Sequence, residues 1–336
     1  MKLTLLCTLT TLGLTFAAAH NLHAADKAQA TSLTMASDVW QPFTDEFQKT
    51  RFAIDLVHSA LGRAGIKPET KILEKWTVPA DLKAGKYDGC GAMWYSKERE
   101  DFLLFSEPYL ENRLILIGQK GSKVDVNSLS ELAGKKLILV KGYAYGDILD
   151  TANGVLIGYG ANDIDNIGAV LKGVADYALV DELLLAHLAK EHKTKAEDKL
   201  AVGSKPLSIN PLHLAIRKDI PGAQAIITSF NKQIRIMLAD GSYNRILRIS
   251  SIRADVDGDG VTELVLGGEK IGPDASVDAY DYSYTDRTMD KVENRKRYWV
   301  NGKLYEDWDN VPEEELEAIQ YEYVDPQGMR LFERTF

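Results

Sequence analysis

The stretch GVLIGYGANDIDNIGAVLKGVADYALVDELLLAHLAKEH, residues 154–192, decides the fold class of this chain. GVLIGYG (154–160) and ADYALV (175–180) are short apolar runs of the kind that form buried strands. DIDNIGAVLKG (163–173) and DELLLAHLAKEH (181–192) carry apolar residues at helical spacing. Strands and helices that alternate over segments this short predict a parallel sheet covered by helices.

The same alternation continues on both sides of this stretch. Three further apolar runs predict strands, and two amphipathic segments predict helices. The strands are expected at 88–94, 112–118 and 135–142, and the helices at 51–66 and 221–241. Between them, Ser128 and Glu131 have the spacing of a capping box that opens a short helix. We therefore expect an α/β protein as far as residue 249.

The sequence changes character after the last of these helices. Residues 251–336 contain 21 acidic and 10 basic side chains, whereas the whole chain has a formal net charge of −9. Tyrosine-rich alternating segments predict strands here, and Asn301-Gly302 and DPQG (325–328) predict turns. VPEEELEAI (311–319) predicts a short helix. We expect residues 250–336 to form an acidic, mainly β module that is large enough to fold alone.

The N-terminal segment has the pattern of a secretory signal peptide. Residues 1–24 combine one positive charge at Lys2, a moderately apolar centre and small residues before Ala24. The alternative is a membrane anchor, but the apolar run is too short and too rich in threonine to span a bilayer stably. We expect cleavage after Ala24 and a periplasmic mature protein. Cleavage would remove Cys7 and leave Cys90 alone, which excludes an intrachain disulfide.

The segment YSKEREDFLLFSEPYLENR, residues 95–113, places one arginine among acidic side chains. A guanidinium is a planar fork that matches a carboxylate and keeps its charge, so Arg99 is a candidate to bind an anionic ligand. It could equally form surface ion pairs, which contribute about 0–1 kcal/mol each. The acidic neighbours available for such pairs are Glu98, Glu100, Asp101 and Glu107. The residues themselves leave both roles open.

Several motifs occur in the order found in periplasmic solute-binding proteins of family 3, the receptors for amino acids in ABC uptake systems. They are SDVWQPF (37–43), AIDLV (53–57), LKAGKYDGCGAMWYSKERE (82–100), LAGKKLILVKG (132–142), ADYALVDE (175–182) and LHLAIRKD (212–219). Residues 32–249 resemble this family, and the tail does not. The resemblance implies a type II periplasmic-binding-protein fold, in which two hinged α/β lobes clamp the ligand. Lobe one would be residues 32–114 and 214–249, and lobe two residues 115–213.

The resemblance also implies roles for three residues. In the family, the arginine at the position of Arg99 pairs with the ligand's α-carboxylate, and the aspartate at the position of Asp181 accepts from its α-ammonium. Trp40 lies where the family has an aromatic side chain that stacks on the ligand. Asp181 could also cap the helix that follows it, since a carboxylate has two oxygens. With these charges on opposite lobes, a zwitterion would favour the closed state.

The supporting positions depart from the family pattern. Trp94 and Ala92 stand where amino-acid binders often have small hydroxylic or polar residues, and Tyr143 and Ala144 stand where threonines would donate. Aromatic side chains therefore enter the expected site, although core packing is the ordinary role of a tryptophan. We expect a smaller or flatter pocket, suited to an aromatic or non-amino-acid carboxylate. The predicted ligand site comprises Arg99, Asp181, Trp40, Trp94 and Tyr143.

The tail carries a second chemical signal, DVDGDGVTEL, at residues 255–264. Its expected calcium ligands are Asp255, Asp257, Asp259, the carbonyl of Val261, and Glu263. The twelfth position is Leu266 instead of the bidentate glutamate of an EF-hand, so the loop more closely resembles the calcium loops of FG-GAP-type extracellular repeats. A solvated Asp-Gly turn is the alternative. We expect a structural Ca²⁺, because three adjacent carboxylates repel one another without a cation.

Together these features favour a non-enzymatic receptor for a small carboxylate-bearing solute, an amino acid or a relative. We expect a monomer that serves an ABC permease or a membrane sensor, and the acidic tail argues against nucleic acid as a partner. One alternative is an enzyme on the same scaffold, similar to cyclohexadienyl dehydratases, although none of the six histidines has an evident partner. Another is a calcium-dependent interaction protein whose ligand cleft has degenerated.

Overall fold

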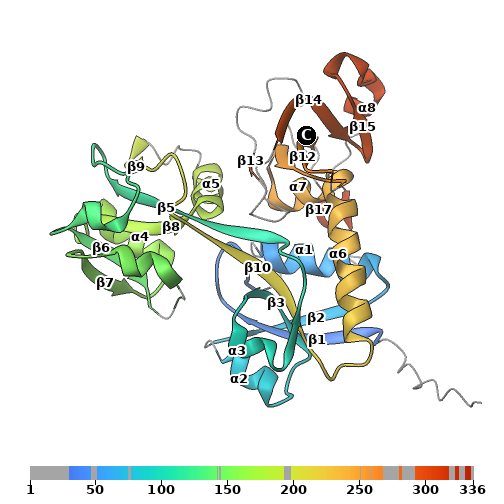
Figure 1. Cartoon of the computed structure of the whole chain (residues 1–336), viewed down its shortest axis with the longest axis horizontal. Coiled ribbons are helices and arrows are strands. Elements are labelled where there is room, and N and C mark those ends of the chain that lie inside the picture. The colour runs from blue at the N-terminus through green and yellow to red at the C-terminus, as the bar shows by residue number, and fades with distance from the viewer. Residues whose placement is uncertain are drawn as a thin grey trace, which may run out of the picture.

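The computed structural model describes most of the chain downstream of residue 29. The described residues are 30–46, 51–74, 77–141, 143, 145–192, 198–249, 251–257, 259–267, 280–281, 292–317, 322–324 and 330–333. The predicted signal peptide (1–24) and the predicted turn at 325–328 lie outside them. The described residues form two α/β lobes and a smaller β-sheet near the C-terminus (Figure 1). None of their helices is both long and apolar enough to cross a membrane.

Lobe one is built on a mixed sheet in which β1 runs parallel to β2 and β3, and β10 runs antiparallel to β3 and β4. The strands are β1 (Ser32–Asp38), β2 (Lys67–Leu73), β3 (Gly89–Trp94), β4 (Leu103–Phe105) and β10 (Ser208–Arg217). The helices are α1 (Phe52–Arg63), α2 (Val78–Lys83), α3 (Lys97–Glu100), α6 (Ala223–Ala239) and α7 (Ser242–Leu247). The predicted helices at 51–66 and 221–241 are therefore confirmed as α1 and α6.

Lobe two contains a parallel trio, in which β6 pairs with both β7 and β8. Its strands are β5 (Leu110–Gln119), β6 (Lys136–Val140), β7 (Leu156–Gly160), β8 (Tyr177–Asp181) and β9 (Leu200–Val202). Its helices are η1 (Leu129–Leu132), η2 (Gly146–Thr151), α4 (Asp163–Leu171) and α5 (Glu182–Glu191). The parallel strands and helices predicted for residues 154–192 are confirmed, but β7 is an edge strand without a buried residue, unlike the buried strand that its apolar sequence predicts.

The short helix expected after Ser128 is a single 3₁₀ turn, η1, and its cap differs from the predicted box. The hydroxyl of Ser128 accepts from the backbone N–H of Ser130 at 3.2 Å. The carboxylate of Glu131 accepts from the N–H of Asn127 at 2.8 Å. Because a 3₁₀ turn is tighter than an α-turn, these side chains reach donors one residue earlier than an α-helical box would use.

Two long strands, β5 and β10, connect the lobes (Figure 1). The main sheet has the order β2-β1-β3-β10-β5-β8-β6-β7, so these two strands lie side by side between the lobes. They are antiparallel, with Leu212 opposite Leu110 and Ser208 opposite Leu114. The lobe boundaries that we predict at 114/115 and 213/214 fall inside these shared strands. A bend of this two-stranded ribbon would therefore move one lobe against the other.

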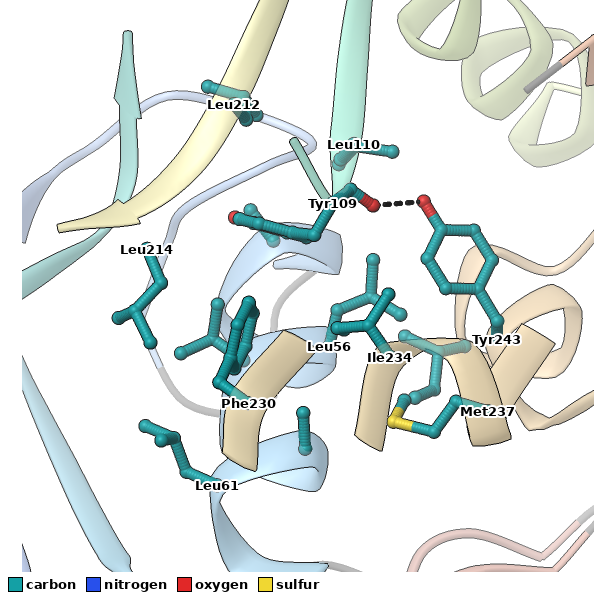
Figure 2. Close-up of a cluster of buried hydrophobic side chains, with 14 of the residues drawn as sticks. Leu56, Leu61, Tyr109, Leu110, Leu212, Leu214, Phe230, Ile234, Met237 and Tyr243 are labelled. Atoms are coloured by element: carbon teal, nitrogen blue, oxygen red, sulfur yellow. Dashed lines mark hydrogen bonds between the residues drawn. The ribbon is translucent and has the colours of Figure 1, made fainter. Parts of the chain in front are cut away.

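The start of β5 is anchored in the core of lobe one (Figure 2). Tyr109, Phe230 and Tyr243 are fully buried there, and the rings of Tyr109 and Phe230 are perpendicular at 5.6 Å. The hydroxyl of Tyr243 donates to the carbonyl of Tyr109 at 2.6 Å, and the hydroxyl of Tyr109 donates to the carbonyl of Gly91 at 2.6 Å. These bonds satisfy both buried hydroxyls and hold the end of the ribbon against α6 and α7.

The tail forms a five-stranded sheet in the order β13-β11-β12-β14-β15, and β16 and β17 form a separate antiparallel pair. The elements are β11 (Ser251–Ala254), β12 (Val261–Leu266), β13 (Tyr280–Asp281), β14 (Val292–Val300), β15 (Lys303–Tyr305), η5 (Trp308–Asn310), α8 (Glu313–Glu317), β16 (Glu322–Val324) and β17 (Arg330–Glu333). Asn301 and Gly302 adopt positive φ values of 50° and 81° between β14 and β15. The predicted Asn-Gly hairpin turn is confirmed.

The tail shares its core with lobe one. Ile252, Ala254 and Val265 are fully buried in the same apolar cluster as the residues of α1 and α6. The side-chain amide of Asn244 donates to the carbonyl of Val265 at 2.9 Å, which ties α7 to β12. The tail therefore differs from the self-sufficient module that we expected, because part of its apolar surface is buried only against lobe one.

Candidate functional site

The predicted ligand residues follow the carboxyl ends of parallel strands in both lobes. In lobe one, β1 ends at Asp38, two residues before Trp40, and β3 ends at Trp94. In lobe two, Tyr143 follows β6, and Asp181 is the last residue of β8. The crevice beyond the carboxyl ends of such strands is where open α/β sheets bind ligands. The strand topology therefore places these residues around one region between the lobes.

Three aromatic rings meet across the lobes. The ring centroids of Trp40 and Trp94, both in lobe one, are 5.8 Å apart at an interplanar angle of 85°. Tyr143 of lobe two lies 5.5 Å from Trp40 at 70° and 6.1 Å from Trp94 at 75°. Near-perpendicular pairs at these distances contribute about 0.5–1.5 kcal/mol each beyond their buried area. We call Trp40, Trp94 and Tyr143 the aromatic trio; it holds the lobes together at this point.

Arg99 lies on the short helix α3 and is partly buried. Its Nη1 donates to the carbonyl of Trp94 at 2.9 Å. Within the described residues it has no carboxylate within 4.0 Å, because Glu100 accepts from Tyr95 and Glu107 pairs with Arg235. The surface ion pairs that we considered for Arg99 are therefore not formed. Its remaining N–H groups stay available beside the aromatic trio.

Asp181 is 3% exposed, and both of its oxygens are engaged. Oδ1 accepts from the N–H groups of Leu183 at 2.7 Å and Leu184 at 3.3 Å, so Asp181 caps α5 as the alternative role requires. Oδ2 accepts from the side chain of Asn112 and the N–H of Arg113, each at 3.1 Å. Burial raises the pKa of Asp181 to about 7, although these hydrogen bonds oppose the rise. A ligand ammonium would have to displace one of four donors.

Asn112, which the sequence did not single out, connects the aromatic trio to Asp181. Its Oδ1 accepts from the indole N–H of Trp94 at 2.8 Å, and its Nδ2 donates to Asp181. Asn112 is fully buried on β5, one residue before Arg113, whose Nε pairs with Glu182 at 2.7 Å. The connecting ribbon thus carries a continuous chain of hydrogen bonds from lobe one to the start of α5. Only its position inside a predicted strand, among apolar residues, could have drawn attention to it.

Asp163 was also missed. It is the first residue of α4, shortly after β7, and is 8% exposed. Burial raises its pKa to about 7. Since β7 runs parallel to β6, Asp163 belongs to the same carboxyl edge of the sheet as Tyr143 and Asp181. The rule that ligands bind beyond the carboxyl ends of parallel strands could have identified Asp163. The sequence pattern alone indicated only that Asp163 is one of two acids in the first turn of a helix.

Lobe two also contains a hollow of about 470 Å³ beside η1 and η2. Its polar lining includes Ser128, Asp147 and Asn210. None of the five predicted ligand residues lines it. The hollow is therefore distinct from the region where the aromatic trio and Arg99 meet.

In the tail, the loop between β11 and β12 brings three carboxylates together. Oxygens of Asp255, Asp257 and Asp259 lie within 4.8 Å of one another, which fits the hard oxygen ligands of Ca²⁺. However, a cation from the protein itself lies among them. Arg297 on β14 places Nη1 3.0 Å from Asp259 and Nη2 3.5 Å from Asp257. The repulsion from which we inferred a metal is therefore relieved by a guanidinium.

Glu263 fits a metal site less well than the aspartates do. It is fully buried, its Oε1 lies 3.0 Å from Nη1 of Arg297, and its Oε2 accepts from the indole N–H of Trp299 at 3.3 Å. Burial raises its pKa to about 7, and the charge of Arg297 opposes the rise. Arg297 and Trp299 lie two residues apart on β14, so both face the loop. Glu263 thus contacts both residues, but its buried Oε1 has no hydrogen bond within the described part of the chain, and Glu263 is outside the group of three aspartates.

Comparison with known proteins identifies the family. Residues 33–249 match the bacterial extracellular solute-binding proteins, family 3. The L-cystine-binding protein TcyJ of Escherichia coli strain K12 is 25% identical over 225 residues, which cover 66% of this chain and 82% of TcyJ.

Two solved structures share the fold of the lobes. An ancestral arginine-binding protein bound to arginine has a TM-score of 0.52 and 23% identity, and the match covers 65% of this chain and 97% of that one. An ancestral amino acid-binding protein, AncCDT-1, described as a precursor of cyclohexadienyl dehydratase, has a TM-score of 0.51 and 23% identity, with coverage of 64% and 93%. The two-lobed fold that we predicted is confirmed, and the chain belongs to the bacterial extracellular solute-binding proteins of family 3.

Proposed function

We propose that this protein is a non-enzymatic receptor outside the cytoplasm for a small, carboxylate-bearing solute of the amino-acid type. Its family and a relative named for binding L-cystine support a receptor for an amino-acid-like ligand. The proposal includes a periplasmic location, a monomeric state, and delivery of the solute to an ABC permease or a signal to a membrane sensor. It also includes lobe boundaries at 114/115 and 213/214.

The placement of Arg99 carries this proposal. In the described part of the chain its guanidinium makes one hydrogen bond, to a backbone carbonyl, and no ion pair. A partly buried arginine without a carboxylate partner favours binding of an external carboxylate, because two parallel N–H groups can donate to its two oxygens. Such charge-assisted bonds contribute about 1.5–3 kcal/mol. The neighbouring aromatic trio joins the two lobes, so a ligand held here would contact both and favour their closure.

Isothermal titration against a panel of amino acids and organic acids tests the proposal. We expect at least one member to bind, and Arg99→Ala to weaken that binding about 10-fold to 100-fold, which corresponds to the loss of 1.5–3 kcal/mol. Arg99→Lys should also weaken it, because an ammonium keeps the charge but lacks the planar fork. Lys97→Ala is the matched control, since Lys97 is an exposed cation on the same helix, α3.

Two outcomes would contradict the receptor proposal. One is the absence of binding across the panel, and the other is binding that Arg99→Ala leaves unchanged. Incubation with prephenate or arogenate addresses the dehydratase alternative. An aromatic product that appears in the absorbance spectrum would show that the protein is an enzyme.

We further propose that the loop at 255–263 takes Ca²⁺ only in competition with Arg297. Asp255, Asp257 and Asp259, with the carbonyl of Val261, would hold the ion, and it would stabilise the link between β11 and β12. Arg297→Gln should increase the rise in melting temperature that CaCl₂ produces, relative to the wild type. An equal calcium response in both proteins would contradict competition. The absence of a response in both would leave no support for calcium or for a calcium-dependent interaction role.

A further inference from the structure

Asp181 has little capacity left for a ligand's positive charge. A carboxylate offers about four lone-pair positions. Asp181 already accepts four hydrogen bonds, from Leu183, Leu184, Asn112 and Arg113. All four donors belong to the capped helix or to the connecting strand. A second carboxylate at this edge of the sheet would be better suited to receive a cation.

Asp163 is such a carboxylate. It is more than nine-tenths buried, and nowhere in the described part of the chain does its side chain form a hydrogen bond or an ion pair. Buried polar groups almost always have a partner, so a partnerless buried carboxylate requires an explanation. Asp165, two residues further along α4, shows the ordinary arrangement. It is exposed, and its Oδ2 accepts from Asn162 at 3.0 Å.

A favourable interaction with the helix does not explain the burial of Asp163. An acid in the first turn of a helix is stabilised by the partial positive charge of the N-terminus. That effect operates equally on exposed side chains, and Asp165 already provides it in the same turn. Burial of Asp163 therefore has a cost that the helix does not require. A cationic group from outside the chain would offset it.

The surroundings of Asp163 also favour a cation. Burial is the main cause of the raised pKa of the hydroxyls of Tyr143 and Tyr145 and of the carboxyl of Asp181, and the negative charge of Asp163 adds to each rise. Asp38, at the end of β1 in lobe one, also contributes to the raised pKa of Tyr143. Asp163 is thus close enough to Tyr143 of the aromatic trio for its charge to act on it. A positive charge there would meet carboxylates and, within about 6 Å of a ring centroid, attractive aromatic faces.

We propose that Asp163, rather than Asp181, accepts the positively charged group of the bound solute. The ligand is then a small carboxylate that also carries an ammonium or guanidinium group. Arg99 of lobe one binds its carboxylate and Asp163 of lobe two binds its cation, so the two charges of one solute draw the lobes together. This inference rests on the receptor function proposed above and names the ligand class of that site.

A series of carboxylates with one carbon skeleton tests the proposal by isothermal titration. Hexanoate has no cation, L-norleucine has an α-ammonium, 6-aminohexanoate has a distal ammonium, and L-lysine has both. We expect the best cationic member to bind the wild type at least 10-fold more tightly than hexanoate. Asp163→Asn should reduce that ratio to less than about 3-fold, since it removes the charge and keeps the shape.

Two variants separate this role from a general loss of charge or of folding. Asp165→Asn removes an exposed charge from the same turn and should leave the ratio unchanged. Asp181→Asn should lower the melting temperature, because it disturbs the cap of α5, but it should retain the preference for the cationic ligand. Asp163→Asn should melt no lower than the wild type, since it removes a buried charge that has no partner among the residues that the structure describes.

Three results would overturn the inference. These are equal binding of hexanoate and the cationic members, a preference that survives Asp163→Asn, and the absence of binding by every cationic member. If Arg99→Ala still abolishes binding of hexanoate or of a ligand from the wider panel, the receptor function stands and only the role of Asp163 fails. If no tested solute depends on Arg99, the receptor function itself fails.

Discussion

Asp181 at the end of β8 and Glu263 in the tail are buried carboxylates with the same raised pKa of about 7, but they have different partners. Asp181 receives four N–H groups that carry no charge. Glu263 has the guanidinium of Arg297 and one indole N–H. The first arrangement satisfies the oxygens and leaves the negative charge in place. The second neutralises the charge and makes the carboxylate dependent on one residue.

This difference suggests that the two sites respond differently to mutation. Removal of one partner from a buried ion pair leaves an uncompensated charge and is strongly destabilising. Removal of one of several neutral donors leaves the others in place and costs about 1–3 kcal/mol. We therefore expect a large loss of stability when Arg297, the cationic partner of Glu263, is replaced. We expect a smaller loss when the hydrogen bonds of Asp181 are disturbed.

The largest effect is expected for Arg297→Gln. This change removes the cation from Asp257, Asp259 and Glu263, and it should lower the free energy of unfolding by about 3–5 kcal/mol, as for other broken buried pairs. Urea unfolding measures the loss. Glu263→Gln in the same chain should restore part of it, because the buried charge is then removed as well.

Arg235→Gln is the control for this prediction. Arg235 pairs with Glu107 at 2.9 Å, but both side chains are about half exposed, so the change should cost at most about 1 kcal/mol. A loss of the same size in the two variants would mean that Arg297 is an ordinary surface arginine. The contrast between the two carboxylates would then disappear.

A smaller effect is expected for Asp181→Asn. The asparagine keeps one oxygen for the N–H groups of Leu183 and Leu184, but its amide opposes the donors from Asn112 and Arg113. We expect a loss of about 1–2 kcal/mol, typical of a helix cap, measured by the same urea unfolding. Asp165→Asn, an exposed acid on the neighbouring helix, should change stability less. If Asp181→Asn lost more stability than Arg297→Gln, Asp181 would depend on its partners more than Glu263 does, contrary to our expectation.

The last prediction is a pH dependence at Asp163, the carboxylate that has neither kind of partner among the described residues. Its pKa is about 7 in the folded protein and 3.8 in the unfolded chain. Between these values the folded state binds more protons, so stability falls as pH rises, and the loss is complete above about pH 7. Asp163→Asn removes this contribution to the pH dependence of stability. The variant should gain stability over the wild type as pH rises from 4 to 8, as seen in melting temperatures.

The measurement must compare two proteins, because His58 acts in the opposite direction. Burial lowers the pKa of His58 from 6.5 to about 3, so the unfolded state binds more protons between these values and stability rises with pH there. This term is present in both proteins and cancels in the difference. A difference that does not change with pH would show that Asp163 is ionised in the folded protein at acid pH.

Much of the fold was predictable because local patterns and tertiary packing agree. The apolar runs at 154–160 and 175–180 became β7 and β8. Burial explains only β8, which is buried throughout, because β7 is the edge strand of the sheet and its Leu156 and Tyr159 are exposed. Asn301-Gly302 became a hairpin turn, since asparagine and glycine tolerate the positive φ values that this turn requires. These features depend on neighbouring residues in the chain.

The partners in the site were less predictable, because they are distant in sequence. Nothing near Asn112 indicates that it bonds both Trp94 and Asp181. Likewise, the acidic loop contains no sign that Arg297, 34 residues beyond Glu263, supplies its cation. The sequence correctly indicated repulsion among the aspartates, but it could not show what relieves that repulsion.

The sequence by itself determined the strands, the helices, the family and the list of residues able to carry charge, because these follow from side-chain chemistry and short-range periodicity. Only the tertiary structure decided which of those charges have partners. Among the residues that it describes, it showed Asp181 with four donors and Asp163 with none, and it placed a guanidinium among the carboxylates of the tail. The physical reason is that hydrogen bonds and ion pairs act over a few ångströms, and the fold alone brings distant residues that close.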